Sequence, residues 1–523
     1  MSSSIDVVGH RTSTPDAHRS QTSKNRRKIL IILALVAAAV LCVAAVLCAK
    51  YWPLSEKEVQ EDLAEAADSS VTIQSYHPTY FPSPGCVLEG IEFRHGANQF
   101  RLIKIDKLII EGSYSGIFIA HVPRITAEGT HIFIPPFGAN TKFHSQHSNL
   151  VVDELIANGT TVEFTSADSQ KHPLTFDVHE AFFRSVRWGN PLHYRLKFHS
   201  PDPPGEISTQ GDFGPWADGH PQDTPMSGSY TFEHADLSVY GGIGGILSST
   251  GTFDGAFQHI NVSGTTDTPD FVVTSSGHAH RLSTHFDAYV DATRGDTFLN
   301  RVEAHFGRTM FIAQGSIASS PGKPGKAANL RFTSRHGRIE DILGLFVTAN
   351  RSPMSGDMSL VARALIAHSD RPFLESVELD GKFGIDDGAF KPETQKDVNA
   401  LSAGARGDQK DDAETALTDL KGTVNLSGGT AQISDLEFGV PGAQAHLHGT
   451  FNIVNHRINL HGEMKVDTKI SKTSSGAKAL LLKIMDPLFR KKEKGEVVPV
   501  HILGTYEKPQ FGLDLANKNE NSK

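Results

Sequence analysis

The sequence has few cysteines and few charged side chains for its length, and both shortages narrow the class of protein. Only 3 of its 523 residues are cysteine, which excludes a disulfide scaffold and a cysteine-based zinc module. Cys42 and Cys48 lie in one apolar block, so Cys86 is the only cysteine outside it. Charged residues make up 21% of the chain and the net charge is −9, which argues against a nucleic-acid-binding protein. With 38% hydrophobic residues and 47 glycines, the composition favours a glycine-rich β protein over a disordered chain.

The chain also lacks the short motifs that mark common catalytic sites. It has no Gly-x-Ser-x-Gly nucleophile motif, and the glycine run at residues 241–245 lacks the Gly-Lys-Ser/Thr ending of a phosphate loop. That run is predicted to be a turn. The pairs His278/His280 and His446/His448 each project from one face of a strand, but no third ligand accompanies them, so solvated histidines are expected. We therefore predict a protein that is not an enzyme and that uses no cofactor or metal.

One long apolar run occupies residues 29–49, which are 21 residues without a charge. As a helix this run would span about 31 Å, enough for the hydrocarbon core of a membrane. Residues 1–28 hold six Lys/Arg and two Asp, whereas residues 50–68 hold two Lys and six acidic residues. The positive-inside rule then places the N-terminus in the cytoplasm and the bulk of the chain across the membrane. The alternative is a cleaved signal peptide, but the run is longer than its apolar region should be and lacks a small-residue cleavage site.

Beyond residue 70, apolar and polar residues alternate, which is typical of strands with one buried face. The clearest runs are 192–199, 377–385, 445–453 and 458–467. Turn signals recur between such runs at a spacing of roughly 8–12 residues, which predicts about 20–25 strands. Examples of these turn signals are residues 202–205, 264–269, 321–325 and 427–429.

Helical signals are sparse. Residues 55–67 are predicted to form an amphipathic helix with Ser55 as its cap and Glu58 completing a capping box, and further helices are predicted at 338–347, 392–405 and 475–485. The predicted organisation is a basic cytoplasmic tail (1–28), a transmembrane helix (29–49), a short amphipathic helix with an access region (50–70), an elongated β trough (71–385), a helix with a solvated loop (386–420), a C-terminal β region with a closing helix (421–515) and a disordered tail (516–523).

Alternation over so many residues creates a sheet with one long apolar face that few helices can cover. A second sheet, closure into a barrel or a bound apolar ligand could each bury this face, whereas an uncovered apolar surface of this size would aggregate. We expect a mainly β fold in which an elongated, curled antiparallel sheet forms an open trough for acyl chains. The residues expected to line the trough are Leu192, Tyr194, Leu196, Phe198, Phe383, Leu447, Phe451, Ile458, Leu460, Met464 and Val466.

The C-terminal part carries the residues of a family resemblance. Segment 436–451 (LEFGVPGAQAHLHGTF) and the alternating run 458–466 look like a C-terminal β domain, and segments 475–487 and 504–511 look like its closing helix and final strand. Together with the single anchor and the short acidic helix, these segments resemble the AsmA-like family of bacterial envelope proteins. The resemblance implies an inner-membrane anchor, a periplasmic β trough related to bridge-like lipid-transfer proteins, and phospholipid traffic for outer-membrane biogenesis.

Two further segments bear on partners. Arg490, Lys491 and Lys492 follow an apolar stretch and are interpreted either as a dock for anionic headgroups or as a solvated basic turn after a capping helix. The prolines within residues 78–84 are expected to shape the access region, as a structural element or as a lipid gateway. Phospholipid and the inner membrane are the expected partners, with an outer-envelope protein at the C-terminal end as a further candidate. The alternative function is a periplasmic scaffold or regulator of outer-membrane assembly.

Overall fold

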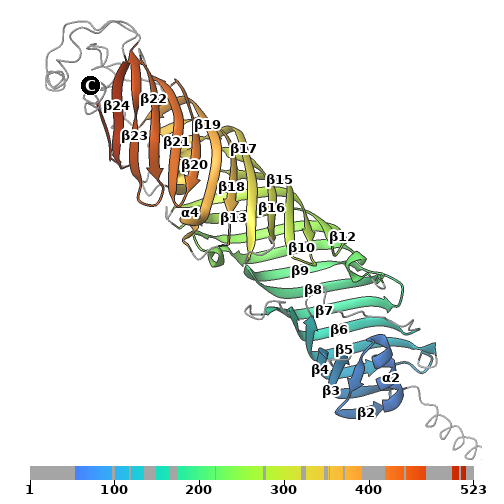
Figure 1. Cartoon of the computed structure of the whole chain (residues 1–523). Helices are drawn as coiled ribbons and strands as arrows, with labels where there is room; N and C mark the ends of the chain where they lie inside the picture. Colours follow the sequence, from blue (N-terminus) through green and yellow to red (C-terminus); the bar gives the residue numbers. More distant parts are fainter. Residues whose placement is uncertain are drawn as a thin grey trace, which may run out of the picture. The chain divides into compact units, whose positions relative to one another are not determined.

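The computed structural model describes residues 54–513, apart from 97–99, 117–118, 135–148, 165–172, 218–219, 275–277, 320–324, 347–351, 353, 369–370, 391–417, 441–442, 467–496 and 506–507. The chain divides into two units, Met1–Asp62 and Leu63–Lys523, and every described strand belongs to the second. In that unit one sheet of 25 strands, mainly antiparallel, curls into a half-barrel (Figure 1). The predicted mainly β fold with a curled, elongated sheet is therefore confirmed.

The number of described strands matches the number predicted from turn spacing. The strands are β1 (Ser70–Thr72), β2 (Ser75–Thr79), β3 (Gly85–His95), β4 (Phe100–Glu111), β5 (His121–Ile134), β6 (Val151–Phe164), β7 (Leu174–Arg187), β8 (Leu192–Pro201), β9 (Pro204–Phe213), β10 (Pro225–Asp236), β11 (Ile243–Gly244), β12 (Ile246–Ala256), β13 (His259–Val273), β14 (Ala279–Asp291), β15 (Asp296–Phe306), β16 (Thr309–Ser319), β17 (Lys326–Arg338), β18 (Met354–Ile366), β19 (Val377–Phe390), β20 (Thr418–Ser427), β21 (Thr430–Val440), β22 (Ala443–Asn452), β23 (Arg457–Val466), β24 (Val497–Thr505) and β25 (Lys508–Leu513).

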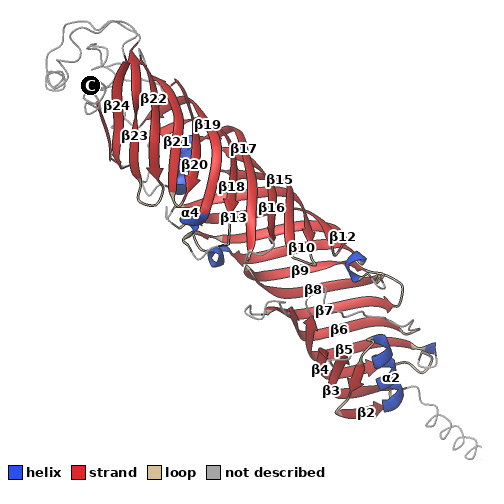
Figure 2. Ribbon diagram, in the orientation of Figure 1, coloured by secondary structure: helices blue, strands red, loops and turns tan. Residues whose placement is uncertain are grey.

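The helices of the described residues are short (Figure 2). They are α2 (Glu56–Ala66), α3 (Ile339–Phe346), α4 (Phe373–Ser376) and the 3-10 helices η2 (Pro221–Asp223) and η3 (Leu237–Tyr240). The backbone nitrogen of Glu58 lies 3.4 Å from Ser55 Oγ, which confirms the predicted cap of α2, and α3 confirms the helix predicted at 338–347. The helices predicted at 392–405 and 475–485 lie outside the described residues.

The predicted membrane anchor also lies outside the part of the chain that the structure describes, as do the tails 1–28 and 516–523. Among the residues that are described, no helix is both long enough and apolar enough to cross a membrane. The anchor at 29–49 therefore stays a prediction. The sheet itself extends into the interval 386–420 from both sides, because β19 ends at Phe390 and β20 begins at Thr418.

Most strands pair with their neighbours in sequence. At the N-terminal edge, β1 and β2 both pair with β3. The expectation of an entirely antiparallel sheet is wrong at one pair, because β5 and β6 run parallel, with His121 opposite Val151. A parallel pair needs a long crossover connection in place of a tight turn, and residues 135–150 separate the two strands.

The turn signals gave correct boundaries in two of the described cases and a wrong one in another. Within the predicted turn 202–205, residues 202 and 203 join β8 to β9, and within 427–429, residues 428 and 429 join β20 to β21. Residues 264–269, however, lie inside β13, which runs from His259 to Val273. The register of β13 against β14 shifts between Thr268 and Phe271. Pro269 thus occupies a bulge, where a residue without an N–H is tolerated in a strand.

The sheet curls toward its apolar face. α3 lies between β17 and β18 in the sequence and contacts both of them. It also contacts β13, which lies several strands away in the sheet. Two α3 residues, Ile339 and Ile342, pack against the buried apolar cluster formed by the strands from β18 to β24. One short helix can touch both distant strands and this cluster only if the apolar face is on the inside of the curl.

Aromatic rings on the apolar face lie across glycines of neighbouring strands. The Tyr230 ring of β10 covers Gly251 of β12 and Gly264 of β13: a Cβ at Gly251 would lie 2.8 Å from a Tyr230 ring carbon and would also collide with the Ser263 carbonyl oxygen. The Tyr230 hydroxyl lies 3.1 Å from Ser249 Oγ. Glycine at these positions therefore lets the ring lie flat on the sheet.

We predict that Gly251→Ala lowers the free energy of unfolding by about 1–3 kcal/mol, because the added Cβ overpacks the space beneath the Tyr230 ring. The control is Thr252→Ala, at the next residue, whose exposed side chain points to the opposite face. Its effect should stay within about 0.5 kcal/mol. Urea unfolding of the full chain, followed by far-UV circular dichroism, measures both. Equal midpoints for the two variants would contradict this account of the glycine.

Candidate functional site

The strand register places both groups of predicted trough residues on one face of the same sheet. Successive register partners carry a row of side chains from β8 to β19. The row is Leu192, Phe213, Met226, Gly255, Ile260, Val290, Thr297, Ile317, Ala328, Ile366 and Val377. Leu379 lies two residues after Val377, on the same face, and begins a second row. The second row is Leu379, Leu426, Ala431, Phe451, Ile458 and Gly504. These two rows therefore lie on one face that is continuous from β8 to β24 and apolar at most positions; we call it the apolar face.

The predicted trough residues of β8 are mostly accessible. Leu192, Leu196 and Phe198 are half-buried, while His193 and Lys197, on the opposite face, are exposed. A half-buried apolar side chain keeps part of its surface free for contact with another molecule. This part of the apolar face is thus open to a ligand.

Tyr194, the fourth predicted residue of β8, is buried in the floor of the sheet. Its hydroxyl oxygen lies 2.8 Å from the position that a Cβ on Gly228 would occupy, and it donates to the Ser227 carbonyl oxygen at 3.4 Å. Burial raises the pKa of Tyr194, so the hydroxyl remains a neutral donor at physiological pH. Tyr194 therefore supports the floor from within.

The predicted residues of the C-terminal strands are more deeply buried. Leu447, Met464 and Leu460 are 2%, 4% and 8% exposed and belong to one apolar cluster. Phe383 and Ile458 are partly buried against the same cluster. This end of the apolar face is packed protein interior, in contrast to the accessible side chains of β8.

Other predicted residues are placed only in part or lie outside the described structure. Phe451 is half-buried on β22. Val466 ends β23, but its side chain is not among those described. The predicted headgroup-docking residues Arg490, Lys491 and Lys492 lie outside the described residues.

The middle of the apolar face carries hydroxyl groups. Thr266 Oγ1 of β13 lies 2.7 Å from Thr284 Oγ1 of β14, and Ser249 Oγ of β12 donates to the Thr265 carbonyl oxygen at 3.0 Å. These hydroxyls are paired with one another or with the backbone. Between β8 and the C-terminal strands, the same face therefore has a strip of mixed polarity on β12, β13 and β14.

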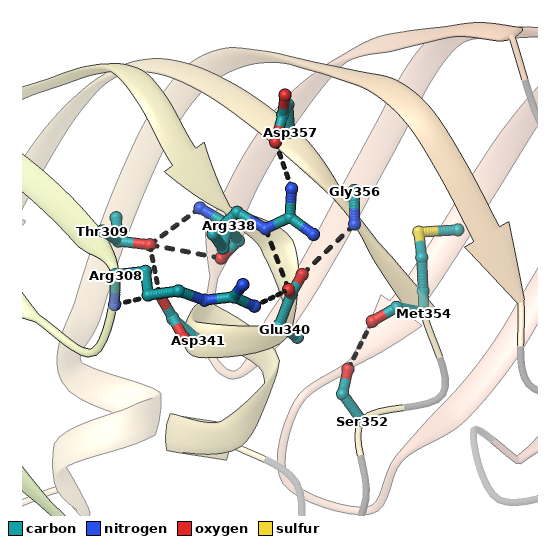
Figure 3. Close-up of polar contacts among 9 residues, drawn as sticks. All are labelled: Arg308, Thr309, Arg338, Glu340, Asp341, Ser352, Met354, Gly356 and Asp357. Atoms are coloured by element: carbon teal, nitrogen blue, oxygen red, sulfur yellow. Dashed lines mark hydrogen bonds and ion pairs between the residues drawn. The ribbon is translucent and has the colours of Figure 1, made fainter.

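Helix α3 is held on the apolar face by charged side chains (Figure 3). Glu340 accepts hydrogen bonds from Arg338 Nε at 2.9 Å and from Arg308 at 2.5 Å. The Gly356 N–H donates to the same carboxylate at 3.2 Å. Partial burial raises the pKa of Glu340, but the hydrogen bonds from its own backbone N–H, from Arg338 and from Gly356 outweigh burial and lower it overall. Glu340 thus remains ionised and ties α3 to β18.

A second carboxylate fixes the same helix to β16. Asp341 Oδ2 accepts hydrogen bonds from the Arg308 N–H and from Thr309 Oγ1, both at 2.8 Å (Figure 3). Thr309 is 1% exposed, so this contact is shielded from water. The two carboxylates together hold α3 in place where Ile339 and Ile342 cover the apolar face.

A cavity that the sequence gave no reason to expect opens on the apolar face. Its volume is about 890 Å³, and we call it the η3 cavity. Its lining includes side chains of two strands, of η3 and of α4: Ile317 of β16, Ile366 of β18, Val239 and Tyr240 of η3, and Phe373 of α4. Of the glycine run predicted to be a turn, Gly241 and Gly242 form a bend directly after η3, whereas Ile243 and Gly244 form strand β11, which pairs with β13. The glycine run was the only sequence feature that marked this region, and no pattern in the sequence predicts that the η3 segment would meet α4.

The remaining groups singled out in the sequence are placed as follows. His446 is exposed and lies 3.4 Å from Glu437 Oε1, while the His280 ring lies 5.0 Å from the Phe306 ring, centroid to centroid. Within the described residues, no group of three His, Cys, Asp or Glu side chains could hold a metal ion. Burial raises the pKa of the Cys86 thiol to about 12, so it stays protonated at neutral pH.

Comparisons with protein-family models, with curated proteins and with solved structures gave no match. The resemblance of segment 436–451 and its neighbours to the AsmA-like family therefore stays a prediction. The arguments about function below come from the geometry of the apolar face.

We predict that Glu340→Gln lowers the free energy of unfolding at neutral pH by about 1–3 kcal/mol, since it weakens charge-assisted hydrogen bonds. The folded state lowers the pKa of this carboxyl, so its contribution is present above the unfolded pKa and is lost as the pH falls through the folded pKa. The difference between wild type and variant should therefore shrink below about pH 4. Urea unfolding at a series of pH values measures it.

The matched control for this prediction is Glu303→Gln. Glu303 of β15 is half-buried, with 32% of its side chain exposed, and a hydrogen bond from Arg301 lowers its pKa. Its replacement should have a smaller effect because its side chain is more exposed than that of Glu340, which is 17% exposed, so water screens the pair. If both variants behaved alike at every pH, the anchoring role of Glu340 would be wrong.

Proposed function

We propose that this protein binds the acyl chains of membrane lipids along the apolar face of its curled sheet and conducts them in the resulting trough. The observation that carries the proposal is the continuity of that face from β8 to β24, combined with the partial exposure of its side chains at Leu196, Phe198 and Ile317. A folded protein does not normally leave a long apolar strip facing water. An acyl chain is the simplest molecule that would cover such a strip.

The hydrophobic free energy of this contact is large enough to hold an acyl chain, and it does not favour one position along the trough. Burial of each CH₂ group contributes about 0.8 kcal/mol, so a chain of 16 carbons gains roughly 12 kcal/mol before the costs of binding. Hydrophobic contact is non-directional, so a chain could move along the trough without leaving it. Transport and binding thus use the same surface.

Exposed aromatic side chains in two adjacent connections support lipid access near the first strands. Tyr80 and Phe81, between β2 and β3, are 58% and 84% exposed, and Tyr114, between β4 and β5, is 55% exposed. The Tyr114 hydroxyl donates to the Tyr80 carbonyl oxygen, so the two connections lie together. Exposed aromatic rings are typical of membrane–water interfaces.

The proposal includes a location and a class of lipid. The apolar run at residues 29–49 would anchor the chain in the inner membrane with its N-terminus in the cytoplasm. The sheet would then work in the periplasm, on phospholipid destined for the outer membrane. The positive-inside charge distribution of the sequence supports this orientation.

A photo-crosslinking amino acid tests which face meets lipid. We expect p-benzoylphenylalanine at Leu196 of the full chain to form adducts with phospholipid acyl chains in cells, detected by mass spectrometry. The same group at Lys197, one residue along on the opposite face, should form almost none. Equal labelling at both positions, or none at either, would contradict the proposal.

A charge on the accessible part of the apolar face should reduce lipid binding without unfolding the protein. We predict that Leu196→Asp lowers the amount of lipid that copurifies with the full chain, since burying a carboxylate against an acyl chain is costly. Lys197→Asp on the opposite face is the control. Leu460 and Met464 suit this test poorly because they lie in the packed cluster, where a charge would destabilise the fold itself.

The outcome of that comparison is read together with circular dichroism. A folded Leu196→Asp variant that retains the wild-type amount of lipid would overturn the trough model. Loss of lipid from both variants would show that a general surface property, and not the apolar face, holds it.

A further inference from the structure

The curled sheet is bridged where the η3 segment reaches α4. η3 and Gly242 lie between β10 and β11, whereas α4 lies between β18 and β19. Gly242 has a φ of +82°, and a Cβ at this position would lie 2.7 Å from Phe373 Cγ. Glycine is therefore required here both by the backbone conformation and by the close approach. The contact closes the curl over the strands between β12 and β18.

The bridging segment is held in a defined position. Asp236 caps η3 by accepting a hydrogen bond from the Ser238 N–H at 2.9 Å, and the Thr274 N–H donates to the Gly242 carbonyl oxygen at 3.0 Å. Burial, together with the neighbouring Asp202, raises the pKa of Tyr240 to about 12. The Tyr240 hydroxyl therefore stays protonated and can bond to Asp202 in the turn after β8.

The η3 cavity lies beneath this bridge and combines an apolar interior with a cationic rim. Its volume of about 890 Å³ falls within the usual range for small-molecule sites of about 300–1,000 Å³. Val239 and Ile317 line it and are 51% and 39% exposed. Their exposed surfaces face the cavity in which an alkyl chain would lie.

The rim carries two cationic side chains. Among the described residues, Lys326 and Arg371 line the cavity together with the Glu375 carboxylate. Lys326 Nζ contacts the Gly295 carbonyl oxygen, which is a neutral partner. Lysine and arginine side chains bind carboxylates and phosphates through charge-assisted hydrogen bonds.

We propose that the η3 cavity is a binding site for an anionic amphiphile, with the alkyl chain against Val239 and Ile317 and the anionic headgroup at Lys326 and Arg371. This inference rests on the proposed function and adds to it a position along the trough and a headgroup charge. A lipid moving along the apolar face would pause at this site, because the cavity combines enclosure with positive charge.

The test uses two photoreactive probes of equal chain length, a diazirine analogue of palmitate and the corresponding fatty alcohol. Both are presented to the full chain in phosphatidylcholine nanodiscs, and adducts are mapped by mass spectrometry. We expect palmitate to label residues 237–242 and 372–376 preferentially. In the double variant Lys326→Gln/Arg371→Gln, labelling by palmitate should fall about tenfold, as expected for the loss of charge-assisted bonds, while labelling by the alcohol is unchanged.

The matched control is Arg331→Gln/Arg335→Gln, which removes two exposed charges from the opposite face of β17. It should leave both probes unaffected. Equal labelling by palmitate and alcohol, with no effect of the Lys326 and Arg371 changes, would overturn this inference and leave the trough model intact. Absence of both probes from the whole apolar face would overturn both. Displacement of palmitate by millimolar inorganic phosphate would show that Lys326 and Arg371 bind a free anion, and this result would also overturn the inference.

Discussion

The structure depends on one constraint, which is that a sheet with strict alternation must cover its apolar face. The row of register partners from Leu192 to Val377 shows that this face does not break between β8 and β19. No second sheet packs against it among the described residues. The protein instead curls the sheet on itself, so that the apolar face lines the concave side of a half-barrel. Curling packs the face into a buried cluster at the C-terminal strands, whereas Leu192, Leu196 and Phe198 of β8 stay half-buried.

The parts of the face that are covered use two different kinds of contact. α3 is fixed by ionised carboxylates at Glu340 and Asp341 and covers the face with isoleucines. The η3 segment is fixed by backbone hydrogen bonds and by the close approach of Gly242 to Phe373. Both covers are short, and both lie over the central and later strands. The side chains of β8 are consequently accessible because neither α3 nor the η3 segment reaches them.

Local features of the fold could be predicted from the sequence, whereas contacts between distant strands could not. Alternation at 192–199 and 458–467 identified real strands with the correct buried side, and the periodicity of 338–347 identified α3. Pro269 was misread as part of a turn because a bulge inside a strand has the same composition as a loop. The contact between Gly242 and Phe373 depends on the twist of the sheet added up over many strands. No local sequence pattern predicts this total twist. The same limit explains why the η3 cavity was missed although its glycine run was noted.

The pairing of nearly every strand with its neighbour in sequence has a consequence for how such a protein can change. Because each hairpin rests chiefly on the one before it, the sheet behaves as a linear array, in which stability is approximately the sum of local terms. Duplication or loss of a hairpin would alter the reach of the molecule by a fixed increment while preserving the cross-section at every other point. The hairpin is thus the unit by which the length of such a sheet can change in evolution. A designed hairpin inserted between β6 and β10 would lengthen the sheet without disturbing the bridge at η3.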